Sequence, residues 1–214
     1  MTQDNKKLVN KLCLTYIEAI NRFSNNNTDS FDLAVKKIIS SENHIVVCGM
    51  GKSGHVGRKI AATLASTGSP SFFLHPAEAI HGDLGMVKKK DVVILISYSG
   101  ETEEILKLIN PLKKLKVTII TFTGNLSSSL SKNSDIIFDI SIDKEACPLN
   151  LAPTTSSMLT MVVGDALAIS LMEARGFAEE DFALTHPGGN LGKNLNYLIK
   201  DKMVTNNLPL VRED

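Results

Sequence analysis

The first forty residues contain two stretches in which apolar side chains recur at helical spacing. The first stretch covers residues 6–22, and its apolar positions are Leu8, Leu12, Ile17 and Ile20. The second begins at Phe31 and ends at Ile39. An apolar residue every three to five positions predicts an amphipathic helix in each. Residues 24–30, rich in Asn and Ser, predict a loop between them.

From residue 44 onward, short apolar runs alternate with helical segments. The runs are residues 44–48, 71–74, 92–96, 117–122 and 136–140. The helical segments between them are residues 52–66, 102–114 and 126–131. Continuously apolar strands that alternate with helices are typical of a parallel sheet covered on both faces. The pattern predicts an α/β fold, a doubly wound three-layer sandwich with five parallel strands and ligands beyond their carboxyl ends.

A longer helical pattern runs from Pro153 to Arg175 and is closed by Gly176. It has few charged residues, so the pattern predicts a buried helix. Burial inside the monomer and burial inside an oligomer both fit this composition.

Composition and charge narrow the possible partners. Lys plus Arg equals Asp plus Glu at 23 each, so net charge favours neither a nucleic acid nor a membrane surface. No apolar run approaches the ~20 residues of a membrane span, and the polar N-terminus lacks the apolar core of a signal peptide. The 3 cysteines are widely separated and have no zinc-finger spacing, which favours a reducing compartment. We therefore expect a cytoplasmic protein. Any anion-binding site in it must be made by a few aligned groups and not by overall net charge.

Glycines mark the segment that follows the first predicted strand. Gly49, Gly51 and Gly54 satisfy the spacing G-x-G-x-x-G at the start of a helix. A dinucleotide site also needs an acidic residue at the end of the next strand, which ends instead at residues 74–76, Leu-His-Pro. The phosphate loop of nucleotide hydrolases needs a glycine at position 46, which is valine. A tight turn and an anion site at a helix N-terminus remain, and Lys52 favours the anion site.

The segment after the third predicted strand carries three hydroxyls around one glycine. Ser97, Ser99 and Thr102 surround Gly100 where a helix begins. Hydroxyls together with helix-terminal amides satisfy phosphate oxygens without many cations. An ordinary N-cap explains one hydroxyl of this kind but not three. The segment, called here the phosphate turn (residues 97–102), therefore predicts a phosphate site.

Three other segments carry acid–base groups. His75, Glu78, His81 and Asp83 lie close together in the chain, but their spacing fits no standard zinc pattern, so no metal is predicted. Glu145 follows the last predicted strand, on the ligand side of the sheet. His186 lies in a segment rich in Gly and Pro.

Together these segments resemble the SIS (sugar isomerase) domain, and within it the arabinose-5-phosphate isomerases. The resemblance spans residues 36–195. Its most specific segments are residues 75–79, His-Pro-Ala-Glu-Ala, residues 145–148, Glu-Ala-Cys-Pro, and residues 186–189, His-Pro-Gly-Gly. The Ser-x-Ser-Gly of the phosphate turn is common to SIS domains in general.

The resemblance implies a specific reaction and a specific set of residues. The reaction is the interconversion of D-ribulose 5-phosphate and D-arabinose 5-phosphate through a cis-enediol, the first step toward the lipopolysaccharide sugar Kdo. It implies a homotetramer with active sites shared between subunits, and no cofactor. The implied catalytic residues are Lys52, His81, Glu104, Glu145 and His186. The implied substrate- and phosphate-binding residues are Gly51, Ser53, His75, Ser97, Ser99 and Thr102.

Two questions stay open at this stage. Glu104, one helical turn past the phosphate turn, and Glu145 both qualify as the base. A phosphoheptose isomerase and a non-catalytic SIS module that senses a sugar phosphate are the alternative functions. We expect residues 1–199 to form the SIS domain, and residues 200–214 resemble the start of a CBS domain, a pair of which follows the catalytic domain in most family members.

Overall fold

The computed structural model describes residues 5–26, 28–41 and 43–187. The chain divides into two compact units, and the division in the sequence falls after Gly176. Residues 177–187 of the second unit contain one short helix, α7 (Glu179–Thr185). The predicted boundary between residues 199 and 200 lies outside the described residues.

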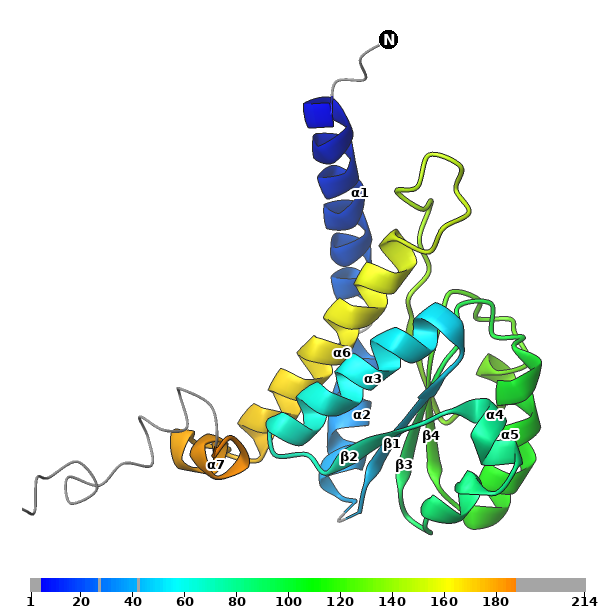
Figure 1. Cartoon of the computed structure of the whole chain (residues 1–214), viewed down its shortest axis with the longest axis vertical. Helices are drawn as coiled ribbons and strands as arrows, with labels where there is room; N and C mark the ends of the chain where they lie inside the picture. Colours follow the sequence, from blue (N-terminus) through cyan, green and yellow to red (C-terminus); the bar gives the residue numbers. More distant parts are fainter. Residues whose placement is uncertain (1–4, 27, 42, 188–214) are drawn as a thin grey trace, which may run out of the picture. The chain divides into compact units, whose positions relative to one another are not determined.

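A five-stranded parallel sheet organises the first unit (Figure 1). Its strands are β1 (Ile45–Gly49), β2 (Ser71–Leu74), β3 (Val92–Ile96), β4 (Thr118–Thr123) and β5 (Ile136–Asp139). They lie side by side in the order β2-β1-β3-β4-β5, and every neighbouring pair is parallel. The predicted α/β sandwich and its five strands are therefore confirmed. In this order the topology reverses between β1 and β3, the point at which such sheets bind ligands.

Helices cover both faces of this sheet. The longer ones are α1 (Asn5–Asn26), α2 (Thr28–Ile39), α3 (Gly51–Ser66), α5 (Glu103–Leu115) and α6 (Thr155–Ala174). Two short elements after β2 were not predicted, namely α4 (Pro76–Ile80) and the 3₁₀ helix η1 (Asp83–Met86). A second 3₁₀ helix, η2 (Ser131–Asn133), precedes β5.

Alternate residues of each central strand enter opposite cores. In β3, Val92, Ile94 and Ile96 pack into the core formed with α2, α3 and α6. Val93 and Leu95 pack into the core formed with α5. A strand with both faces buried must be apolar at every position, which is why these runs are continuous in the sequence.

Helix α6 packs one side into the core of the first unit. It is long and apolar enough, by length and composition, to cross a membrane, and half of that stretch is buried within the described fold. Leu159, Val163 and Leu167 are fully buried in the core beneath it. The predicted buried helix over residues 153–175 is confirmed within two residues at each end.

Two predicted elements were wrong. Residues 24–30 do not form an extended loop, because α1 continues to Asn26 and α2 begins at Thr28. Continuation of the helix lets Phe23 pack edge-on against Phe138, with ring centroids 6.3 Å apart. Residues 126–131 form turns leading into η2 and not a helix.

The turns in residues 126–131 follow from local hydrogen bonds. The Ser127 amide donates to Asn125 Oδ1 at 3.1 Å, and the Ser131 amide donates to Ser128 Oγ at 3.2 Å. Short polar side chains that bond nearby amides compete with the helical pattern of backbone bonds. A segment made mostly of serine therefore folds as turns.

Candidate active site

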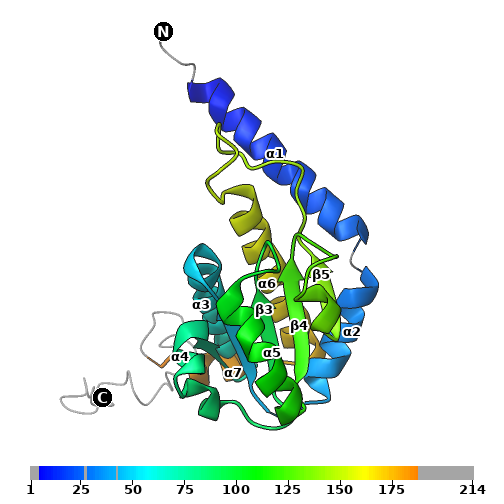
Figure 2. The same cartoon turned by 90° about the vertical axis from the view of Figure 1, so that its right-hand side faces the viewer.

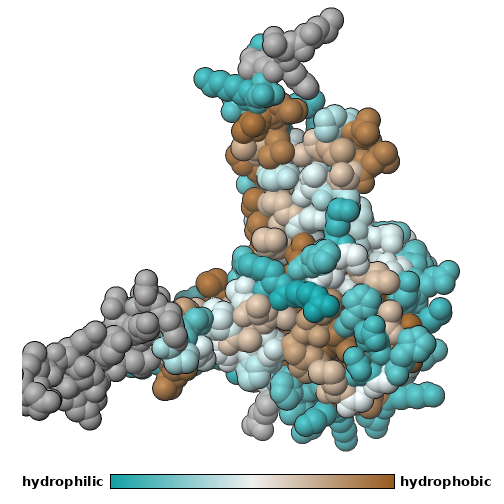
Figure 3. Space-filling view, viewed as in Figure 1, coloured by the Kyte–Doolittle hydropathy of each residue, from teal (hydrophilic) through white to brown (hydrophobic). Residues whose placement is uncertain are grey.

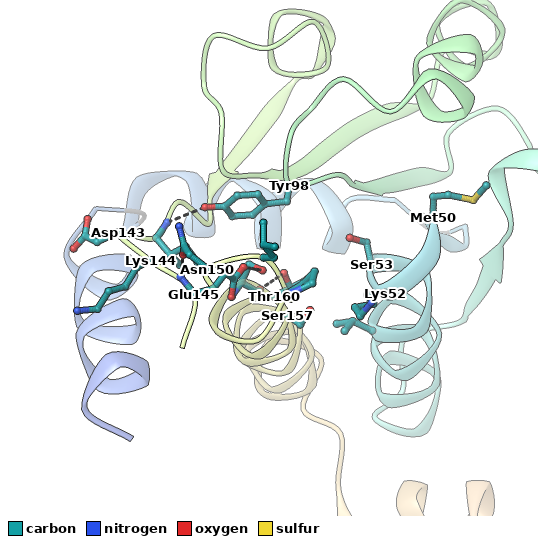
Figure 4. Close-up of a pocket in the computed structure, with 15 residues that line it drawn as sticks. Met50, Lys52, Ser53, Tyr98, Asp143, Lys144, Glu145, Asn150, Ser157 and Thr160 are labelled. Carbon is teal, nitrogen blue, oxygen red and sulfur yellow. Dashed lines mark hydrogen bonds between the residues drawn. The ribbon is translucent and has the colours of Figure 1, made fainter. Parts of the chain in front are cut away.

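A cavity of about 540 Å³ opens at the carboxyl ends of the strands in the first unit. Its walls come from the start of α3, from Tyr98 after β3, from the loop after β5 and from the first two turns of α6. Figure 4 shows Lys52 and Ser53 on α3 opposite Glu145 and Asn150 of the loop, with Tyr98 nearby. The volume suits a small ligand, and the place is the switch point between β1 and β3.

The glycine segment positions Lys52 and Ser53. A Cβ on Gly54 would lie 2.6 Å from the Gly49 carbonyl oxygen, so these two glycines allow α3 to begin directly against the end of β1. Gly51 has a φ of +55° and no described atom near the position of a Cβ. Among the described residues, no side chain caps the start of α3. Its first amides and the Lys52 ammonium therefore present positive charge toward the cavity.

The phosphate turn is braced by its own hydroxyls. Ser97 is buried, its Oγ lies 2.8 Å from Thr102 Oγ1, and it accepts a bond from the Gly100 amide at 3.1 Å. Ser99 is exposed, and its Oγ accepts from the Glu101 amide at 3.2 Å. Ser97 therefore shapes the turn, whereas Ser99 and the N-terminus of α5 face outward.

Helix α5 begins without a side-chain cap from the described residues. Thr102 occupies the N-cap position, but its hydroxyl makes no capping bond. The ordinary N-cap interpretation of the three hydroxyls is therefore not what the structure shows. An uncapped N-terminus of a 13-residue helix is suited to an anion.

Tyr98 joins the phosphate turn to the opposite wall. Its hydroxyl oxygen accepts a bond from the Ile142 amide at 3.3 Å, and its ring lies against Gly124. Burial, helped by the nearby Glu145 carboxylate, raises the pKa of Tyr98, so the phenol is neutral at pH 7. Tyr98 was missed by the sequence analysis because it lies at the variable position of Ser-x-Ser-Gly.

Glu145 is held by the N-terminus of α6. The amides of Thr154 (2.8 Å) and Ser156 (3.3 Å) and the hydroxyl of Thr154 (3.1 Å) donate to its Oε2, and the Ser156 hydroxyl donates to Oε1. Partial burial raises the pKa of Glu145, but the hydrogen bonds from Ser156 and Thr154 outweigh burial and lower it. The carboxylate is therefore ionised at neutral pH.

The other carboxylate in the cavity wall is Asp143. It pairs with Arg22 of α1, with Nη1 and Oδ1 2.6 Å apart. Both carboxylates that line the cavity within the described residues, Asp143 and Glu145, are therefore engaged by other protein groups.

Several predicted site residues lie outside the lining of this cavity. His75 and His81 flank the short helix α4, and His75 Nδ1 is buried without a hydrogen-bond partner in the described structure. Glu104 is half-buried in the first turn of α5. The structure thus brings Lys52, Ser53 and Glu145 together in one cavity, whose lining includes neither Gly51 nor Ser97, Ser99 and Thr102 of the phosphate turn. It places His75, His81 and Glu104 elsewhere along the carboxyl edge of the sheet.

His186 belongs to the second unit. Its ring stacks on Phe182, with centroids 3.8 Å apart, and its Nδ1 lies 3.0 Å from the Phe182 carbonyl oxygen. Its place relative to the cavity is not described, so its predicted role stays a prediction. Within the described residues, no three His, Cys, Asp or Glu side chains gather as a metal site.

The sequence analysis also missed a hydroxyl-rich wall. Asn150, Ser156, Ser157 and Thr160 line the cavity along with Glu145. The run Thr-Thr-Ser-Ser at residues 154–157, where a helix begins, was the available signal for part of this wall. Hydroxyls at a helix start are ordinarily caps, so this run does not by itself predict a binding site.

Comparison with known proteins identifies the family. The family model described as SIS domain matches residues 38–170. The chain belongs to the SIS domain family. Among SIS proteins, it is 56% identical over 184 residues to "Arabinose 5-phosphate isomerase KdsD" of Pseudomonas aeruginosa, covering 86% of this chain and 56% of the relative. It is also 56% identical over 176 residues to KdsD of Escherichia coli K12, covering 82% and 54%.

A solved SIS structure agrees with the described fold. The Escherichia coli CFT073 protein c3406, solved in complex with arabinose 5-phosphate, is 44% identical with a TM-score of 0.82, covering 87% of this chain and 100% of that one. The chain spans about half the length of the two KdsD relatives.

Proposed function

We propose that this SIS protein is an arabinose-5-phosphate isomerase that interconverts D-ribulose 5-phosphate and D-arabinose 5-phosphate. The observation that carries the proposal is the arrangement at the switch point, where α3 begins without a side-chain cap from the described residues and contributes Lys52 and Ser53 to a cavity. Tyr98 of the phosphate turn lines the same cavity. This arrangement suits a small phosphorylated ligand. The similarity to the KdsD relatives and to the protein solved with arabinose 5-phosphate supports that sugar over other sugar phosphates.

The chemistry requires proton transfer between C1 and C2 of the open-chain sugar. A base removes the proton at one carbon, a cis-enediol forms, and the proton returns at the other carbon. The developing charge on the oxygens needs a cation or a donor, which Lys52 supplies from the start of α3. His81 and His186 serve as candidates for ring opening or for moving protons between the two oxygens.

We assign the base to Glu104, with Glu145 as the alternative. Glu104 lies in the first turn of α5, which follows the phosphate turn directly, so a substrate bound there by its phosphate is within the same part of the molecule. Its half-buried carboxylate lies outside the lining of the cavity of a single chain. We propose that a second subunit closes this cavity. We also propose that His186 reaches the site across a subunit interface.

We propose that the chain assembles as a homotetramer, and exposed apolar side chains support association between subunits. On α1, Val9, Leu14 and Ile17 are more than half exposed, and in the loop after β5 Leu149 and Leu151 are 74% and 78% exposed. Figure 3 shows apolar surface over both segments. Figure 2 shows the same loop close to α1. Apolar surface of this kind on neighbouring segments is typical of a protein–protein contact.

We further propose that the protein is cytoplasmic, needs no cofactor, and binds neither nucleic acid nor membrane. We propose that its product enters Kdo synthesis. The free thiols of Cys13, Cys48 and Cys147 fit a reducing compartment. The buried half of α6 fits a core helix better than a membrane span.

Substrate assays test the proposed reaction. The purified protein should convert arabinose 5-phosphate to ribulose 5-phosphate and should act poorly on sedoheptulose 7-phosphate. Preference for sedoheptulose 7-phosphate would instead indicate a phosphoheptose isomerase. Binding of a sugar phosphate without turnover of either would indicate a sensing module.

The phosphate turn has its own test in a double variant, Ser99→Ala with Thr102→Ala. Loss of both hydroxyls should raise KM for arabinose 5-phosphate strongly, since two phosphate contacts are removed. An unchanged KM would show that the phosphate binds elsewhere. Shared sites are tested by mixing inactive Lys52→Ala and His186→Ala subunits, since hetero-oligomers should regain activity only if one site uses both chains.

A further inference from the structure

Glu145 lines the cavity, as a general base would, but its carboxylate also caps the N-terminus of α6. Both of its carboxylate oxygens accept hydrogen bonds, three at Oε2 and one at Oε1. A 20-residue helix favours negative charge at this end, so the carboxylate is stabilised in its ionised form. A carboxylate whose ionised form is stabilised by hydrogen bonds is a weaker base.

Further hydrogen bonds hold the loop after β5 against the start of α6. The Asn150 Oδ1 accepts from the Glu145 amide at 2.7 Å, and Asn150 itself has a φ of +54°. The Ala146 amide donates to Thr155 Oγ1 at 2.9 Å, and the Cys147 amide donates to Thr154 Oγ1 at 3.2 Å. We call this set of contacts the Glu145 latch; it comprises Glu145, Ala146, Cys147, Asn150, Thr154, Thr155 and Ser156.

The latch holds one wall of the cavity in place. Asp143, Lys144, Asn150 and Leu151 line the cavity from the loop that the latch closes. On its far side, the same loop borders a second cavity of about 260 Å³ against α1. The Arg22–Asp143 pair and the bond from the Ile142 amide to the Tyr98 hydroxyl fix the start of the loop. With space on both sides, residues 144–154 depend on the latch, and its loss should let the wall move.

We propose that Glu145 is a positioning residue, which holds residues 144–154 as a cavity wall through the Glu145 latch, and that another group transfers the proton. The kinetic part of this proposal rests on the proposed isomerase function. The structural part does not, because it concerns the loop alone. The two parts therefore need separate measurements.

Kinetics of Glu145→Gln and Ser156→Ala test the role in the reaction. A glutamine cannot accept all four bonds, and Ser156→Ala removes one of them while leaving the carboxylate intact. We expect both variants to lose activity by similar factors, roughly tenfold, with the double variant no worse than Glu145→Gln. The acid limb of the kcat/KM profile should keep its midpoint in both, since the titrating base is unchanged.

A base would behave differently. Loss of the general base costs about 10²–10⁴-fold. If Glu145→Gln lost more than about 10³-fold and its acid limb disappeared, while Ser156→Ala stayed near the wild type, the proposal would be overturned. Ser134→Ala is the matched control, because its hydroxyl donates to the Leu130 carbonyl ahead of β5, away from the latch. It should keep wild-type activity.

Limited proteolysis tests the latch without any isomerase assay. The bonds that α6 donates to a charged carboxylate restrain opening of the loop, so their loss should raise cleavage after Leu149 or Leu151 roughly tenfold. Both Glu145→Gln and Ser156→Ala should show this increase, and Ser134→Ala should not. Cleavage at the wild-type rate in Ser156→Ala would refute the latch even if Glu145→Gln failed to fold. An inactive wild type would refute the proposed function and leave the proteolysis result valid.

Discussion

Replacement of Gly100 by alanine perturbs the phosphate turn in two ways that add. Gly100 has a φ of +69°, and an L-residue in that conformation costs about 1–2 kcal/mol. The added Cβ would also lie 2.1 Å from Ser128 Oγ and 2.4 Å from Ser128 Cβ. Relief of an overlap of this kind costs about 1–3 kcal/mol. The expected loss in the free energy of unfolding is therefore about 2–5 kcal/mol.

Gly176→Ala separates the two costs. Gly176 has a φ of +64°, but no described atom lies within 4 Å of its would-be Cβ, so only the conformational cost applies. Thermal unfolding of both variants measures the difference, which should be about 1–3 kcal/mol, or about 2–12 °C in Tm. Gly100→Ala should also raise KM for the sugar phosphate, whereas Gly176→Ala should leave it unchanged. Equal Tm values for the two variants would refute the close packing of the turn against Ser128.

Two further outcomes are expected. At pH 7.5, iodoacetamide should alkylate Cys147 much faster than Cys48. Hydrogen bonds from backbone amides, first that of Ala152, lower the pKa of Cys147, whereas burial raises the pKa of Cys48 to about 12. Comparable alkylation rates in a peptide map would contradict this. Glu104→Gln should lower kcat by about 10²–10⁴-fold. The control is Glu103→Gln, which should change kcat little, because Glu103 is exposed and pairs with Lys107 at 3.9 Å. A Glu104→Gln enzyme with a kcat within a factor of a few of the wild type would remove the base assignment.

The sheet could be predicted from the sequence because burial on both faces leaves a continuous apolar run. Each of the five predicted strands overlaps the observed one closely, as in β3, where the bounds Val92 and Ile96 agree. The turns at residues 126–131 could not be predicted in the same way. Their structure depends on which nearby amide each short polar side chain accepts a hydrogen bond from, and the hydropathy pattern does not encode these pairings.

The site was predictable in part for a similar reason. Lys52 and Glu145 lie in the segments that follow β1 and β5, so the topology alone places them at the carboxyl edge of the sheet. The role of Glu145 was not predictable, because its partners Thr154 and Ser156 lie at the start of a helix further along the chain. The sequence shows a carboxylate near a ligand site, and only the folded chain shows that α6 holds it.

The isomerase proposal is tested most directly by proton NMR of the purified protein with D-arabinose 5-phosphate in D₂O. Proton transfer through a cis-enediol predicts that ribulose 5-phosphate forms and that deuterium enters at the carbon that receives the proton. The Lys52→Ala variant should show neither change at a comparable rate. A wild-type sample that forms no ribulose 5-phosphate above the uncatalysed rate would contradict the proposed function.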